Sequence, residues 1–268
     1  MRGGNRAAGR GGRVRARAHP RVLVTRPALQ GSELAEHLGR LGVEVVHVPL
    51  LRILPPVSYA PLDQALRRLE SYAWVVFTSQ NGVRAVERRL RDLGIPVEAL
   101  RGVHTAAIGP ATARLLARLG VPPVLQPSEY RAEGLVEAFA AYELRGVRIL
   151  IPRAEGARDV LPQGLRERGA EVAVVAAYRV ETAWEEAPRL RRAIQEGVDA
   201  VTLTSPSAAR ALVSLLEGRL PEETRVVCIG PVTAQAAREL GIRVDGVAEV
   251  YTSEGMVQIL QSLLEGGR

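Results

Sequence analysis

The chain contains the same module twice. The block WVVFTSQNGVRAV at residues 74–86 matches DAVTLTSPSAARAL at 199–212, and AIGPATARLL at 107–116 matches CIGPVTAQAA at 228–237. Further matched segments begin at Arg21 and Arg148, His37 and Gly164, and Tyr130 and Tyr251. All pairs keep one order along the chain, at offsets of 121 to 127 residues. Because self-similarity at a constant spacing marks repeated structural units, the sequence predicts two similar lobes that arose by internal duplication.

Each copy alternates short apolar runs with helix-like segments of about ten residues. In the first copy a strand pattern at 74–77 precedes a helix pattern at 83–93, and another strand at 105–108 precedes a helix at 111–119. The remaining predicted elements of this copy are strands at 22–25, 43–48 and 124–125 and helices at 32–41, 62–69 and 132–142. Unbroken Val/Ile/Leu strands are typical of parallel sheets buried on both faces. We therefore predict an α/β fold, two similar lobes with parallel sheets flanked by helices.

The pattern breaks at equivalent points of the two copies. Residues 51–61 are proline-rich and extended, and residues 178–188 occupy the same place about 127 residues later. Two such breaks predict a two-strand linker between the lobes. Lobe one is then discontinuous, 21–52 plus 183–268, and lobe two is 53–182. Two contiguous halves that divide near Gly146 are the alternative.

Almost all of the net charge of +7 belongs to the beginning of the chain. Residues 1–20 contain six arginines and no acid, so 30 basic residues remain beside 29 acidic ones. We expect residues 1–20 to be a disordered basic tail, with a nucleic-acid-binding arm or a transit peptide as the alternatives. We expect no membrane association, because no run approaches the roughly 20 apolar residues of a membrane span. A single cysteine, Cys228, favours a reducing compartment, and the cytoplasm is the expected location.

Several kinds of chemistry are excluded by residue types that the chain lacks. All 36 basic residues are arginine, which excludes a Schiff-base lysine and a P-loop lysine. The four histidines lack metal-ligand spacing, and one cysteine cannot form a Cys/His zinc cluster. We expect neither a metal nor a cofactor.

Both repeated blocks place hydroxyl residues and glycines where a strand runs into a helix. Thr78 and Ser79 precede one helix, and Ser205 precedes Pro206, which favours Ser205 as a helix cap. The IGP sequences place Gly109 and Gly230 at similar turns. Such helix starts expose backbone N–H groups that bind anions, although single Ser or Thr residues there usually serve only as caps. Four paired junctions facing one gap predict an anion-binding site.

Other candidates lie near the ends of predicted strands. Arg26, Arg153 and Arg158 follow the first strand of each copy, where guanidinium groups bind carboxylates or remain solvated. Tyr178 ends a strand beside the second linker segment.

The order of these motifs resembles the uroporphyrinogen-III synthase family over nearly all of residues 20–268. The most specific motifs are the paired TS junctions, the two IGPxTA blocks, the stretch IPRAEGARDVLPQGLRERGAEV at 151–172 and the sequence AYRVET. Members of that family have two α/β lobes, the first discontinuous, joined by two strands around a substrate cleft, which favours the discontinuous division. One departure is that the family often has a basic residue after its first TS pair, where this chain has Gln80, Asn81 and Gly82, with Arg84 later.

The resemblance implies cyclisation of linear hydroxymethylbilane to uroporphyrinogen III, with inversion of ring D and loss of water. Such a lyase acts in the biosynthesis of haem, sirohaem and cobalamin. Tyr178 is then the candidate general acid. The implied substrate-binding residues are Thr78, Ser79, Thr112, Arg153, Ser205, Ser207, Gly230 and Thr233.

The expected partners are the substrate and the product, together with hydroxymethylbilane synthase, the enzyme that precedes this step. We expect a monomer that does not bind nucleic acid. The competing hypothesis is a non-enzymatic two-lobed anion-binding or regulatory protein, for which the same cleft and loops would serve.

Overall fold

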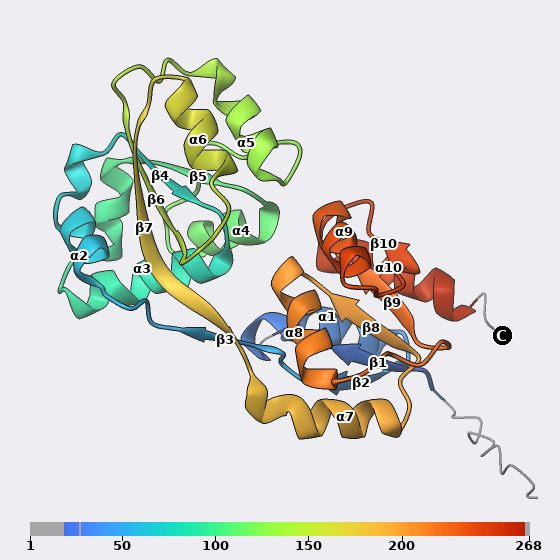
Figure 1. Ribbon diagram of the computed structural model, residues 1–268. Coiled ribbons are helices and arrows are strands. Elements are labelled where there is room, and N and C mark those ends of the chain that lie inside the picture. Colours follow the sequence, from blue (N-terminus) through green and yellow to red (C-terminus); the bar gives the residue numbers. More distant parts are fainter. Residues whose placement is uncertain (1–18, 27, 266–268) are drawn as a thin grey trace, which may run out of the picture.

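The computed structural model describes residues 19–26 and 28–265, with no side-chain description for 28–33. It contains two five-stranded sheets (Figure 1). The first has the order β10-β9-β8-β1-β2, with all neighbours parallel. Its strands are β1 (Arg21–Val24), β2 (Glu44–His47), β8 (Ala200–Leu203), β9 (Arg225–Cys228) and β10 (Gly246–Val247). The second has the order β3-β7-β6-β4-β5. Its strands are β3 (Leu51–Leu54), β4 (Trp74–Phe77), β5 (His104–Ala107), β6 (Arg148–Ala154) and β7 (Glu171–Thr182).

We call the first sheet with its helices lobe one and the second sheet with its helices lobe two. The chain leaves lobe one through β3 and returns through the end of β7, and these two strands pair antiparallel (Figure 1). This arrangement is the predicted two-strand linker. A division near Gly146 would cut the second sheet between β5 and β6. The predicted boundaries, 21–52 plus 183–268 and 53–182, stay predictions.

Lobe two packs helices on both faces of its sheet because alternate strand residues point to opposite sides. Val75 and Phe77 belong to the cluster that packs against three helices, whereas Trp74 and Val76 pack against the other two. The three are α2 (Ala60–Arg67), α3 (Gln80–Asp92) and α4 (Pro110–Arg118), and the two are α5 (Ala132–Ala138) and α6 (Val160–Glu167).

Lobe one repeats this arrangement, as the duplication predicts. Leu23 packs on the side of three helices, and Val22 and Val24 pack on the side of two. The three are α7 (Ala187–Gln195), α8 (Pro206–Leu216) and α9 (Pro231–Glu239), and the two are α1 (Ala28–Arg40) and α10 (Ser253–Glu265). The predicted fold class is confirmed.

Several predicted bounds differ from those observed. The helix predicted at 83–93 begins at Gln80, because Ser79 caps it and the first turn lies ahead of the apolar pattern. The helix predicted at 32–41 begins at Ala28. The helix predicted at 132–142 ends at Ala138 and continues as a 3₁₀ turn at Phe139–Ala141. The strand predicted at 124–125 is a single bridge between Leu125 and Ala106.

Two further predictions concern the start of the chain and the membrane. The predicted basic tail falls almost wholly on residues 1–18, which lie outside the described residues. As for membrane association, none of the helices within the described part of the chain is long and apolar enough to cross a membrane.

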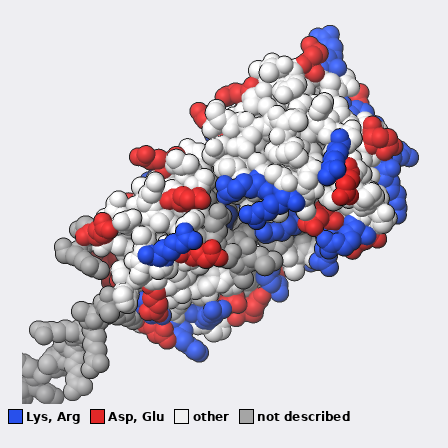
Figure 2. All heavy atoms as spheres, turned by 180° about the vertical axis from the view of Figure 1, so that it is seen from behind, with Lys and Arg blue, Asp and Glu red and all other residues white. Residues whose placement is uncertain are grey.

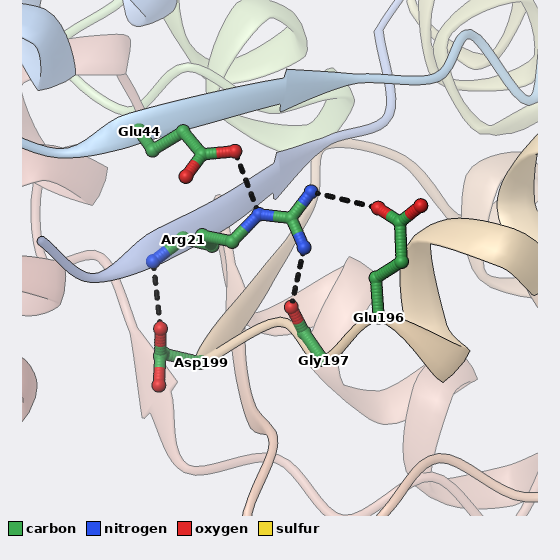
Figure 3. Close-up of polar contacts among 5 residues, drawn as sticks. All are labelled: Arg21, Glu44, Glu196, Gly197 and Asp199. Carbon is green, nitrogen blue, oxygen red and sulfur yellow. Dashed lines mark hydrogen bonds and ion pairs between the residues drawn. The ribbon is translucent and has the colours of Figure 1, made fainter. Parts of the chain in front are cut away.

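A buried arginine ties the two separate parts of lobe one together (Figure 3). Arg21 begins β1, and its side chain donates through Nε to Glu44 at 2.7 Å and through Nη1 to the carbonyl of Gly197 at 3.0 Å. Its Nη2 lies 3.3 Å from Glu196, and its backbone N–H donates to Asp199 at 2.6 Å. These contacts join β1 to β2 and to the segment before β8. They lie at the start of the strands, at the edge of the sheet opposite to the strand ends.

Arg21→Met should therefore destabilise lobe one. We expect the free energy of unfolding to fall by about 1–3 kcal/mol, the usual range for hydrogen bonds to a charged group, reduced here because Glu44 and Glu196 are about half exposed. Urea unfolding measures the effect, and Arg40→Met, an exposed arginine at the end of α1, is the control. Equal stabilities of the two variants would show that the network contributes nothing.

Candidate active site in the cleft between the lobes

A cleft of about 930 Å³ lies between the two lobes, and the carboxyl ends of strands from both sheets border it. From lobe two, Ser79 follows β4 and Gly109 follows β5, and from lobe one Thr25 follows β1. From lobe one, Ser205 follows β8 and Ile229 follows β9. Ligands of open parallel sheets bind at this edge, where loops lead into helix N-termini.

Two helices that begin at the cleft are capped by the predicted serines. The Oγ of Ser79 accepts a hydrogen bond from the backbone N–H of Gly82 at 3.1 Å, which caps α3. The Oγ of Ser205 accepts one from Ala208 at 3.1 Å, which caps α8. The cap predicted at Ser205 is confirmed, and the structure shows the same device at Ser79 in the other copy of the repeat. Each cap satisfies one backbone donor and leaves the positive end of the helix at the cleft.

The other repeated junction begins a helix without a side-chain cap. Proline opens both α4 and α9, immediately after Gly109 and Gly230. A tyrosine lies against each glycine, since a β-carbon on Gly109 would lie 3.6 Å from the Cβ of Tyr130, and one on Gly230 would lie 3.2 Å from the Cδ1 of Tyr251. Both glycines have extended φ values, so neither is required by backbone strain. The ring of Tyr251 lies tightly against Gly230, whereas the contact of Tyr130 with Gly109 is at ordinary van der Waals distance.

Tyr178 lies at the point where β7 exchanges one partner for another. Up to Tyr178 this strand pairs with β6, and from Arg179 onward it pairs with β3. The side chain is 7% exposed and lines the cleft, and its hydroxyl lies 2.8 Å from the Oγ of Ser79. Burial raises the pKa of Tyr178 above its ordinary value, and hydrogen bonds with Ser79 and Asn81 partly oppose this. The hydroxyl therefore stays protonated at neutral pH and is able to donate a proton.

Most of the predicted site residues lie in this cleft. Those that line it are Thr78, Ser79, Thr112, Tyr178, Ser205 and Ser207. Arg26 lines it as well, whereas Arg158 does not.

Three predicted binding residues are not among those that line the cleft. The guanidinium of Arg153 donates to the carbonyl of Arg158 at 2.7 Å and pairs with Asp159. Thr233 lies in the first turn of α9 and is only 4% exposed. The ring of Tyr251 covers Gly230. Their substrate-binding role stays a prediction that this geometry does not support.

Some residues that line the cleft were not predicted. They are Arg114 and Arg118 on α4, the two tyrosines Tyr130 and Tyr251, and Glu254 at the start of α10. The arginines follow the IGP turn at a spacing of four residues, which places them on one face of a helix. That spacing is a signal that the sequence contained.

Residues 32–258 match the family model described as uroporphyrinogen-III synthase HemD. The chain belongs to the uroporphyrinogen-III synthase family. It is 32% identical to a putative uroporphyrinogen-III synthase of Methanothermobacter thermautotrophicus, over 89% of this chain and 96% of that protein. It is 31% identical to the uroporphyrinogen-III synthase of Synechococcus elongatus, over 90% and 94%. Family membership makes the protein an enzyme of tetrapyrrole synthesis.

Solved structures of the family share the fold. A mutant uroporphyrinogen III synthase from the extremely thermophilic bacterium Thermus thermophilus superposes with a TM-score of 0.63 at 23% identity, covering 92% of this chain and 99% of that one. The uroporphyrinogen-III synthetase of Helicobacter pylori has a TM-score of 0.60 at 17% identity, covering 91% and 99%. At these identities the likeness supports the fold and leaves the roles of individual residues to the geometry of the cleft.

Proposed function

We propose that the protein is a lyase that closes linear hydroxymethylbilane into uroporphyrinogen III, with inversion of ring D and release of one water. The observation that carries this proposal is the pair Tyr178 and Ser79, in hydrogen-bond contact within a cleft bordered by helix N-termini of both lobes. The pair offers a proton donor, and its surroundings suit a ligand with many carboxylates.

The reaction needs only a proton donor and control of geometry. The hydroxyl group of the substrate leaves as water when it takes a proton from Tyr178, and the remaining carbon becomes an electrophilic azafulvene. A pyrrole carbon of the last ring attacks it to give a spiro intermediate, which fragments and recloses with that ring inverted. The ring carbon that forms the final bond loses a proton as the pyrrole regains aromaticity. Because this proton can return to Tyr178, the net change is the loss of one water.

Orientation of the two ends of the linear substrate accounts for the rest of the catalysis. Hydroxymethylbilane also closes spontaneously without inversion, so the protein must favour one approach of the two ends over another. Ser79 orients the Tyr178 hydroxyl, and it is itself held by its hydrogen bond from Gly82. The start of α4 has no side-chain cap, and its residues 109–112 line the cleft, so its backbone N–H groups remain for substrate carboxylates.

Isomer analysis tests the proposal. Incubation of the purified protein with freshly prepared hydroxymethylbilane should yield mainly uroporphyrinogen III, whereas the same substrate alone should yield isomer I. After oxidation to the porphyrins, chromatography resolves the two. Production of isomer I alone would overturn the proposal. Binding of uroporphyrinogen III without catalysis would favour the non-enzymatic anion-binding protein.

The remaining expectations about partners and location follow from this function. An unstable substrate favours transfer from hydroxymethylbilane synthase, the enzyme that makes it, and that partner is a proposal, as is the monomeric state. The cytoplasm is the proposed location, on the ground that a single buried cysteine is typical of a reducing compartment.

A further inference from the structure

The two copies of the repeat share a backbone arrangement but differ in charge at the cleft. Helix α4 of lobe two and helix α9 of lobe one are equivalent, because both follow an IGP turn. At matched positions 121 residues apart, α4 has Arg114 and Arg118 where α9 has Gln235 and Glu239. The duplication thus supplies an internal comparison, in which the same element is basic in one lobe and neutral or acidic in the other.

The arginines of lobe two face the cleft, and their counterparts do not. Arg114 and Arg118 line it, together with Arg84 from α3. Gln235 and Glu239 are absent from the lining, and the Nε2 of Gln235 donates to Glu239 at 2.9 Å along the surface of α9. Figure 2 shows basic side chains grouped at the junction of the two lobes.

The facing wall from lobe one carries acids. Glu36 on α1 and Glu254 on α10 both line the cleft. The pKa of Glu254 is lowered, first by its own backbone N–H and then by the Thr252 hydroxyl and the charges of Arg114 and His37. Arg114 and Glu254 both line the cleft, one from each lobe, and the charge of Arg114 favours the ionised form of Glu254. Arg26 and His37 also line the cleft from lobe one, so the charge of that wall is mixed, whereas the described lining of lobe two contains three arginines and no acid.

We propose that Arg84, Arg114 and Arg118 bind the carboxylates of the linear tetrapyrrole, so that lobe two supplies the main guanidinium anchor of the substrate. This inference rests on the proposed function. Guanidinium groups bind carboxylates in forked pairs, and a substrate with eight carboxylates offers several such pairs at once. The acids of lobe one repel the same groups. An anchor on one lobe holds part of the linear substrate, while the other end of the substrate stays free to turn, as ring inversion requires.

Exchanging the residues of the two copies tests the anchor. The variant Arg114→Gln/Arg118→Glu gives α4 the side chains of α9. We expect KM for hydroxymethylbilane to rise about tenfold or more, with kcat within about threefold of the wild type, because the arginines bind the substrate and do not touch the reacting bond. The decline of kcat/KM between low and high NaCl should become clearly shallower than in the wild type, since fewer charge pairs remain to be screened.

A control variant with the same change of net charge separates the loss of contacts in the cleft from the effect of net charge. Arg88→Gln/Arg91→Glu alters two exposed arginines of α3 that are not among the residues lining the cleft. Its KM and salt dependence should match the wild type. Adding Gln235→Arg/Glu239→Arg to the exchange variant should not restore KM, because these positions lie away from the cleft.

Several outcomes would overturn the anchor. One is a wild-type KM and salt dependence in Arg114→Gln/Arg118→Glu. Another is an equal rise of KM in the control Arg88→Gln/Arg91→Glu. The third is recovery of the wild-type KM when Gln235→Arg/Glu239→Arg is added to the exchange variant. Should the exchange variant fail to fold by circular dichroism, Arg84→Gln and Arg118→Gln singly should each raise KM at least about threefold, and unchanged values would refute the inference. Failure of the proposed function looks different, because the wild type would then form no isomer III.

Discussion

Tyr178→Phe is expected to lower the turnover number at least tenfold while the protein remains folded. The substitution removes only the hydroxyl that lies 2.8 Å from Ser79, and it keeps the ring that packs in the core of lobe two. General acid catalysis by a positioned side chain contributes roughly 10²–10⁴-fold, so its loss exceeds the effect of one neutral hydrogen bond. Single-turnover formation of uroporphyrinogen III, with KM measured in parallel, should show the loss in kcat.

The pH dependence supplies a second readout for Tyr178. Burial raises its pKa above the ordinary value of 10.0, so the hydroxyl is protonated over the whole neutral range. The contribution of this shift to stability is complete below pH 10 and is lost as pH rises through the higher folded pKa. A decline of kcat caused by ionisation of Tyr178 should therefore begin only above about pH 10.

A buried tyrosine outside the cleft is the matched control. Tyr72 is 9% exposed in the same lobe, and its ring lies beneath the guanidinium of Arg148. Tyr72→Phe should keep wild-type turnover. Wild-type turnover in Tyr178→Phe would instead remove Tyr178 from the mechanism and leave proton donation to another group.

Gly255→Ala should be among the most destabilising single changes in lobe one. Gly255 lies in the first turn of α10, and a β-carbon there would overlap the carbonyl oxygen of Val250. The backbone must move to relieve that overlap, and overpacking of this kind costs about 3 kcal/mol. Gly134, at the matched position of lobe two, meets the carbonyl of Glu129 in the same way. Both copies thus require glycine for one steric reason.

The strain would also reach the cleft, because the residues just before Gly255 line it. Tyr251 and Glu254 both belong to this segment. We expect a lower midpoint of urea unfolding and a higher KM in Gly255→Ala. Gly39→Ala is the control, since nothing lies within 4 Å of a β-carbon there and alanine in a helix stabilises by roughly 0.5–1 kcal/mol. A midpoint for Gly255→Ala equal to that of the wild type would contradict the steric argument.

Features that depend on neighbours along the chain were predictable. Ser205 caps α8 as expected, because a serine before Pro206 is a local signal of a helix start. Gly42, Gly94 and Gly120 follow their helices with φ values of +69°, +70° and +74°, which few other residues adopt. The duplication then required that both halves use the same elements in the same order.

Features that depend on distant segments were not predictable in this way. Arg153 lies near the carboxyl end of β6, as expected, but its guanidinium pairs with Asp159 and does not line the cleft. Thr233 has the expected place in the first turn of α9, and the packing of that turn buries it. Conversely, the spacing of Arg114 and Arg118 places both on one face of α4, but only the tertiary structure shows that both line the cleft.

By itself, the sequence determined the α/β architecture and the helix starts that border a site, since these follow from residue types at short spacing. It also determined the duplication, which follows from segments repeated 121 to 127 residues apart, and the resemblance to the family favoured the two-strand linker over two contiguous halves. Only the tertiary structure decided which side chains share the cleft. It brought Tyr178 to Ser79 across 99 residues of chain, and it set the arginines of α4 opposite the acids of α1 and α10. The physical reason is that side-chain direction depends on packing between elements far apart in the chain, which local spacing does not encode.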